Sequence, residues 1–209
     1  MKILKVLAVV FLTVSMLVAY QSCKTLTQIT NSLTNLKRCQ FMLQNVNGFR
    51  LAGVDLSNKR SISDFSISDA FKLTSAFATK QLPAQFVLNV AAKNPNDGKG
   101  GSPQTNATLT GLDWRLLIDD VQTVSGEIDH NIEIPGTGQT SIIPLTVNLD
   151  LYQFFGQQGY DKILNLALAL GGVNSSPTRL KLDVHPTVST PMGAISYPGR
   201  ITVVDKEYK

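Results

Sequence analysis

Residues 86–96 read FVLNVAAKNPN, a stretch that predicts one strand running into one turn. Phe86, Leu88 and Val90 recur at every second position, the period of a strand with one buried face. The strand should end at Asn94-Pro95-Asn96, because proline cannot donate a hydrogen bond to a neighbouring strand and asparagine accepts the backbone dihedrals of a turn. We therefore expect a core strand that is closed by a structured turn.

A hairpin is predicted upstream of this strand. The pattern is extended from Cys39 onward, and Asn47-Gly48 is the kind of dipeptide that tight hairpin turns favour. Phe49 and Leu51 should then begin the returning strand, and Gly53 predicts a bulge in it.

A helix is predicted between this hairpin and the core strand. Ser66 can cap its first turn, where Asp69 is favourably placed against the helix dipole, and Pro83 should stop it. One face of the helix is shared by Ile67, Phe71, Thr74 and Ala78.

Downstream, apolar residues at alternate positions predict five more extended segments. They are marked by Leu112, Trp114, Leu116 and Ile118; by Ile128, Ile132 and Ile134; by Ile143, Leu145, Val147 and Leu149; by Leu180, Leu182 and Val184; and by Ile201 and Val203. Pro144 lies on the other face of the third segment, which predicts an edge strand or a bulge there.

A second helix is predicted from Tyr152 to Leu170, weakened in its first half by Gly156 and Gly159 and ended by Gly171-Gly172. Its buried stripe comprises Phe155, Ile163, Ala167 and Leu170. The whole pattern predicts a mainly β fold, an immunoglobulin-like or fibronectin-III-like β-sandwich of about seven strands with one or two inserted helices.

The first 22 residues have the pattern of an export signal. Lys2 and Lys5 precede an apolar run, Val6 to Val18, that is shorter than the about 20 residues of a transmembrane helix. Tyr20-Gln21-Ser22-Cys23 resembles the lipobox of bacterial lipoproteins, in which the cysteine receives a diacylglycerol and becomes the mature N-terminus. That motif usually has leucine where Tyr20 stands, and the alternative is an ordinary secretory signal with an incidental cysteine.

Residues 23–38 should form a lipid-anchored tether or a short helix ahead of the domain at 39–209. Leu26, Ile29, Leu33 and Leu36 recur at helical spacing. The segment has few basic residues and no aromatic residue, so packing or simple tethering is favoured over binding to a membrane surface.

The charge balance excludes a nucleic-acid footprint. Removing residues 1–22 takes away two lysines and no acidic residue, so 17 basic against 15 acidic residues leave a net charge of +2. The positive charges are scattered along the chain, whereas nucleic-acid binding needs a basic patch.

The sequence shows no pattern typical of a catalytic or metal-binding site. Cys39 alternates with apolar residues and should be a small buried hydrophobe, and His130 and His185 lack the neighbours of a zinc site or a catalytic triad. Asp119-Asp120 stands where a strand runs out, and the glycines of 97–103 lack phosphate-loop spacing. We expect no catalytic centre, no metal and no cofactor, with His130, beside two isoleucines, as the histidine that could point inward.

Four marks in their order resemble the late-embryogenesis-abundant (LEA) type 2 family, whose modules include the water-stress and hypersensitive-response domain. They are an Asn-Pro-Asn strand end, a glycine-led strand, an Ile-Pro-Gly turn before a hydrophobic strand, and a Thr-Pro-x-Gly segment. The residues that carry them are Asn94, Pro95, Asn96, Gly111, Pro135, Gly136, Pro191 and Gly193. The resemblance implies a β-sandwich, a structural role for these turns, and an association with stress or desiccation tolerance. The helix at 66–80 lies outside the plain module.

Two functions from different classes fit these observations. The first is a monomeric, non-catalytic protective or interaction module, tethered to a membrane by acyl chains and facing the periplasm. The second is a periplasmic carrier for an apolar or lipid ligand, held between the sheets or under the helix at 152–170. A cavity of about 300 Å³ or more would favour the carrier.

Replacing the lipidation residue tests the anchor. Because acyl chains contribute about 0.8 kcal/mol for each buried methylene, two or more chains hold a protein firmly, and Cys23→Ala should release it from membranes or leave it unprocessed. Membrane fractionation checks this outcome. An unmodified mature N-terminus in intact-mass analysis of the wild type would contradict the assignment.

Overall fold

The protein is represented by a computed structural model that describes residues 38–99, 104–171, 178–190 and 193–208. The export signal, Cys23, most of the 23–38 segment and Pro191 lie outside the described residues.

Strand β3 (Pro83–Lys93) forms the middle of one sheet, as its alternating pattern predicts. Phe86, Leu88 and Val90 are almost completely buried on its inner face. It pairs antiparallel along its whole length with β7 (Thr140–Asp150) and on its other side with β1 (Gln40–Leu51). The short β2 (Val54–Asp55) completes this first sheet, in the order β2-β1-β3-β7. Pro144 is therefore on an edge strand.

The second sheet is also antiparallel and has the order β10-β8-β4-β5, with β6 paired to β4 and β9 paired to β8. Its strands are β4 (Ala107–Ile118), β5 (Val121–Gly126), β6 (Ile132–Ile134), β8 (Thr178–Thr190), β9 (Gly193–Ser196) and β10 (Ile201–Tyr208). The described residues contain seven strands of six residues or more, which agrees with the predicted number of about seven, and three strands of two to four residues (β2, β6 and β9). Strand β5 was not predicted, and the segment predicted from Ile128 to Ile134 forms only the short β6.

The two sheets enclose one hydrophobic cluster, which confirms the β-sandwich. Leu88 and Val90 of the first sheet and Leu112, Leu116 and Leu182 of the second are all fully buried. Burying such a side chain contributes about 1.5–3 kcal/mol, so the alternating residues of β3, β4 and β8 are the main source of the fold's stability.

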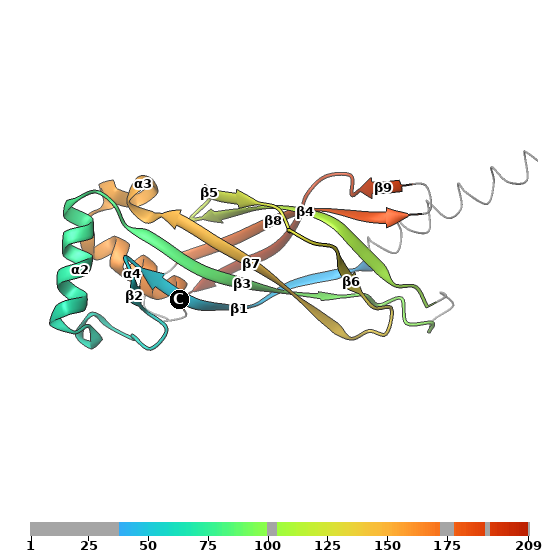
Figure 1. The fold of residues 1–209 in the computed structure, drawn as a ribbon, viewed down its shortest axis with the longest axis horizontal. Coiled ribbons are helices and arrows are strands. Elements are labelled where there is room, and N and C mark those ends of the chain that lie inside the picture. The colour runs from blue at the N-terminus through green and yellow to red at the C-terminus, as the bar shows by residue number, and fades with distance from the viewer. Residues whose placement is uncertain (1–37, 100–103, 172–177, 191–192, 209) are drawn as a thin grey trace, which may run out of the picture.

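Three helices gather at one end of the sandwich (Figure 1): α2 (Ile67–Ala78), α3 (Leu151–Phe155) and α4 (Tyr160–Leu170). Ser66 caps α2, and Asp69 bonds back to the Ser66 backbone, as predicted. The predicted helix at 152–170 is interrupted where glycine weakens it, by a 3-10 turn at Gly156–Gln158 and by Gly159 at φ +88°. The predicted buried stripe, Phe155, Ile163, Ala167 and Leu170, is buried.

The predicted hairpin turn at Asn47-Gly48 is wrong. Strand β1 runs through these residues, and the pairing with β3 shifts register between Asn47 and Arg50. The chain reverses at Ala52-Gly53, where both residues have positive φ angles (47° and 78°) and Leu51 pairs with Val54. Gly48, at φ +62°, supplies a bulge that keeps Phe49 and Leu51 pointing into the core.

The elongated sandwich has two different ends (Figure 1). Gln40, near the start of the described chain, pairs with Lys93, directly before the Asn94-Pro95-Asn96 turn. We call this end, with residues 94–96 and 134–136, the turn pole. Leu51 pairs with Ala84 at the opposite end, beside α2, α3 and α4, which we call the helix pole.

Gly126 tests the packing of the second sheet. It lies opposite Trp114, the single tryptophan, and a Cβ at this position would lie 2.5 Å from the ring. Gly126→Ala should therefore lower stability by about 1–3 kcal/mol through overpacking and should shift the Trp114 emission. Thermal unfolding followed by fluorescence checks both effects. Ser125→Ala, at the exposed neighbouring position, is the control, and equal melting of the two variants would contradict the steric account.

Candidate functional site

The side chain of Asn94 is completely buried at the turn pole. Its Nδ2 donates to the backbone oxygens of Thr105 at 2.8 Å and Ile134 at 3.1 Å. Its Oδ1 accepts from the backbone N–H of Asn96 at 3.1 Å and from the Asn96 Nδ2 at 2.7 Å. Because a buried amide without partners is costly, these bonds hold the end of β3 against segments of the second sheet.

Gly136 packs against the same turn. Its N–H donates to the Asn106 Oδ1 at 2.9 Å. A Cβ at Gly136 would lie 2.5 Å from the Thr105 oxygen and 2.7 Å from the Asn96 oxygen, so a side chain does not fit there without backbone movement. The Asn-Pro-Asn and Ile-Pro-Gly marks, far apart in the sequence, therefore meet at one place.

The other glycines of the resemblance lie elsewhere. Gly111 is on β4 at a register shift, where a Cβ would lie 3.4 Å from the Thr187 Cβ. Beside it, the Glu127 carboxylate accepts hydrogen bonds from the backbone N–H groups of Leu112 and Ile128. Gly193 begins β9 at φ +115°. Their positions are those of strand irregularities.

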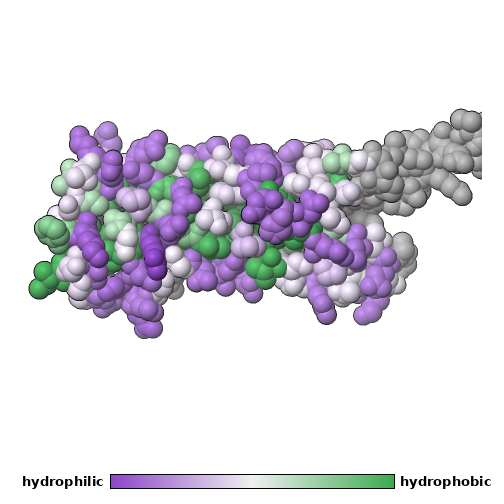
Figure 2. Space-filling view, viewed as in Figure 1, coloured by the Kyte–Doolittle hydropathy of each residue, from purple (hydrophilic) through white to green (hydrophobic). Residues whose placement is uncertain are grey.

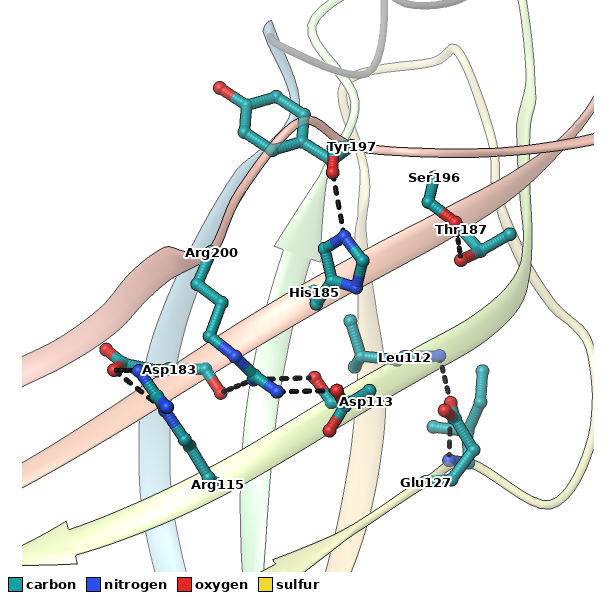
Figure 3. A network of polar contacts seen from close by, with 11 residues as sticks. Leu112, Asp113, Arg115, Glu127, Asp183, His185, Thr187, Ser196, Tyr197 and Arg200 are labelled. Atoms are coloured by element: carbon teal, nitrogen blue, oxygen red, sulfur yellow. Dashed lines mark hydrogen bonds and ion pairs between the residues drawn. The ribbon is translucent and has the colours of Figure 1, made fainter. Parts of the chain in front are cut away.

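Charged residues on the outer face of the second sheet form a cross-strand network (Figure 3). Asp183 on β8 is 9% exposed and accepts from the Arg115 guanidinium at 3.1 Å and the Thr202 hydroxyl at 3.0 Å. Arg200 bonds the backbone oxygen of Asp183 at 3.3 Å and forms an ion pair with Asp113. The network joins β4 and β8 to the segment that enters β10, and its charges are engaged with one another.

Both histidines have structural or exposed positions. His130 lies in the loop before β6 with 67% of its side chain exposed, and Asp129 is its partner among the described residues. The inward orientation that its isoleucine neighbours allowed is therefore wrong, because the chain turns outward between β5 and β6. His185 lies on β8, where its Nε2 contacts the backbone oxygen of Tyr197 at 2.8 Å.

Cys39 is buried, as predicted, and burial raises the pKa of its thiol to about 11. The thiol is therefore protonated at neutral pH.

Asp119 and Asp120 form the two-residue turn between β4 and β5, with φ angles of 50° and 61°, and Asp120 pairs with Lys181 at 3.1 Å. In the described part of the chain no three His, Cys, Asp or Glu side chains gather in a way that could hold a metal ion.

A surface depression of about 510 Å³ lies on the outer face of the first sheet. It is lined by residues of β1, β3 and β7, among them Arg50, Gln85 and Asn148, and lies near the helix pole. The predicted carrier needs its cavity between the sheets or under the helix at 152–170, and this depression is at neither place.

An exposed apolar surface lies at the helix pole (Figure 2). Ile67 is 91% exposed and Phe71 is 74% exposed on α2, and Ile62 in the preceding 3-10 turn is 51% exposed. We call these three residues the apolar tip. The face shared by Ile67, Phe71, Thr74 and Ala78 thus points to solvent along its whole length.

The orientation of α2 is decided by partners on α3 and α4. Leu73 is 1% exposed, and Phe77 packs edge-on against Tyr152 at 5.2 Å and Tyr160 at 5.4 Å between ring centroids. The face that carries Leu73 and Phe77 is buried against the core and these rings, which leaves the face of Ile67 and Phe71 to solvent. Among the described residues, no helix is both long enough and apolar enough to cross a membrane.

Comparison with known proteins finds solved structures that resemble this one with low TM-scores. No family model matches the sequence, and no curated protein matches it. A solution structure described as that of a "putative late embryogenesis abundant (LEA) protein" is 15% identical, with a TM-score of 0.36, covering 91% of this chain and 86% of that one. An Arabidopsis thaliana solution structure is 16% identical (TM-score 0.31; 60% and 75% covered), and an Archaeoglobus fulgidus crystal structure is 9% identical (TM-score 0.34; 61% and 85% covered).

Replacing the buried asparagines tests whether the turn pole is structural. Asn94→Ala with Asn96→Ala should lower the free energy of unfolding by about 1–3 kcal/mol, because it removes the buried hydrogen bonds of the Asn94 side chain with the Ile134 oxygen and with Asn96. Asn45→Ala with Asn89→Ala is a matched control, since that pair bonds at 2.8 Å on an exposed face. Denaturant unfolding measures both. Equal stability of the two double variants would contradict the structural role, and lost function with an unchanged melting curve would point to a binding site.

Proposed function

We propose that this protein is a non-catalytic lipoprotein of the bacterial cell envelope, anchored to a membrane by acyl chains on Cys23 and facing the periplasm. Its LEA type 2-like sandwich serves as a protective or interaction module during water stress. The anchor rests on the export signal and on Ser22-Cys23, and the stress role rests on the order of the family marks. The meeting of two of these marks at the turn pole supports the family assignment.

The observation that carries the interaction role is the separation of the two poles. Gln40 is at the turn pole, whereas the apolar tip is at the helix pole (Figure 1). An acyl anchor on Cys23 would join the chain ahead of β1, so the turn pole would be tethered and the helix pole presented outward. Contiguous exposed apolar side chains are a common mark of interaction surfaces.

The state of the titratable groups supports a non-catalytic role. Catalytic centres gather groups that perturb one another in a cleft. Here Asp183 and Asp113 are neutralised by arginines, Cys39 is held protonated, and His130 lies in an exposed loop. The carrier alternative lacks a comparable observation, because the depression lies outside the core.

Survival after drying tests this proposal. Deleting the gene should lower the survival of cells after drying and rewetting, and the wild-type gene should restore it. A gene for His130→Gln should restore survival equally, because the side chain is exposed and outside the core, whereas Cys23→Ala should not.

Immunoblots of each strain control for the amount of protein. Undiminished survival of the deletion strain would refute the protective role. Turnover of a substrate by the wild type that is abolished in a folded His130→Gln protein would refute the non-catalytic role.

A further inference from the structure

The apolar tip is held in place by a preorganised frame. Hydrogen bonds with Ser66 lower the pKa of Asp69, which also pairs with Lys59 at 3.2 Å. Asp64 accepts from the backbone N–H groups of Arg60 at 2.7 Å and Ser61 at 3.0 Å. These bonds fix the backbone of the 3-10 turn and of the first turn of α2. Ile62 and Ile67 are therefore held in exposed positions.

The geometry of α2 suits a flat surface. The helix runs across the end of the sandwich, transverse to its long axis (Figure 1), and hydrophobic atoms lie at the extremity of this end (Figure 2). A helix that binds a membrane surface lies in the plane of the interface with one apolar face inserted. The exposed face of α2 therefore has the orientation that such binding needs.

The charges beside the tip favour an anionic surface. Residues 59–80 hold four basic and two acidic residues, and Asp64 and Asp69 are engaged in the capping bonds. Arg60, Lys72 and Lys80 are exposed. Each basic side chain near an anionic bilayer surface adds electrostatic attraction. The tip therefore combines apolar side chains with flanking cations.

The size of the tip argues against a second copy of the chain. A stable protein interface takes about 20–30 residues on each side, and the tip offers three large apolar side chains. Insertion into a bilayer needs no complementary partner shape, because each apolar side chain gains independently from leaving water.

We propose that the apolar tip of α2 inserts into the surface of a lipid bilayer with anionic headgroups. This inference rests on the proposed interaction role and names its partner. With an acyl anchor at the turn pole, the protein would hold a second membrane surface at its helix pole.

The first experiment reports insertion directly. In the full-length chain, Phe71→Trp should shift its emission to shorter wavelength when vesicles containing phosphatidylglycerol are added, and it should shift less with phosphatidylcholine alone. Trp114 gives a constant background because it is 4% exposed. Met42→Trp is the matched control, since Met42 is 63% exposed on the outer face of the first sheet. This readout needs no acyl chain.

The second experiment measures capture. The full-length protein is bound to phosphatidylcholine vesicles and then offered fluorescent phosphatidylglycerol vesicles. Ile67→Ser with Phe71→Ser should lower capture by about tenfold or more, since two inserted side chains are lost. Lys72→Glu with Lys80→Glu should lower it through charge, whereas Met42→Ser with Ile142→Ser should match the wild type. Thermal melting of each variant confirms that it folds.

Each outcome decides between the proposals. Equal emission shifts of the Phe71→Trp and Met42→Trp chains, or no shift in either, would overturn the lipid assignment. A dimer in sedimentation that disappears with Ile67→Ser and Phe71→Ser, without vesicle binding, would assign the tip to a second copy. Failure of the wild type to float with the first vesicles, combined with a Phe71→Trp shift, would refute the acyl anchor and leave the tip supported.

Discussion

The side-chain amide of Asn94 is the interaction on which the joining of the two sheets at the turn pole depends. It is fully buried, and its Nδ2 reaches backbone oxygens that precede β4 and end β6. The bond to the Ile134 oxygen is buried, and a buried group left without its hydrogen bond costs about 1–3 kcal/mol. The close approach of Gly136 to Thr105 and Asn96 depends on the same geometry. One polar side chain thus fixes the register of segments forty residues apart in the chain.

The two poles of the sandwich are stabilised in different ways. At the turn pole, the side chains of Asn94 and Asn96 are buried, and Asn94 bonds to backbone oxygens. At the helix pole, the rings of Phe77, Tyr152 and Tyr160 hold α2 in place, and its opposite face stays apolar and exposed. Buried polar contacts and the exposed apolar tip are therefore at opposite ends of the sandwich.

The charged residues of the second sheet illustrate why the number of ionisable groups says little about chemistry. Arg115 and Thr202 satisfy Asp183, and Arg200 bridges Asp113 to the next strand (Figure 3). These pairs give each carboxylate a charged partner and link neighbouring strands. Groups used in this way contribute cross-strand stability, each to a modest extent because they are partly exposed.

Local features of the sequence determined most of the elements. The alternation in β3, β4 and β8, the Ser66 cap and the glycines that interrupt the helix at 152–170 each act within a few residues, so sequence was sufficient to predict them. The residues of the Asn-Pro-Asn and Ile-Pro-Gly marks were recognised too, but their contact with each other was not, because it joins distant segments.

Tertiary structure decided the features that depend on contacts between residues far apart in the sequence. Asn47-Gly48 and Ala52-Gly53 both suit a turn, and the pairing of Phe49 and Leu51 with the core side of β3 selected the second. The loop path outside the core turned His130 to solvent. Packing of Leu73 in the core and of Phe77 against Tyr152 and Tyr160 buried one face of α2 and left Ile67 and Phe71 exposed. The candidate site on Ile67 and Phe71 therefore exists only in the folded molecule, because side chains some eighty residues away determine which face is left for solvent.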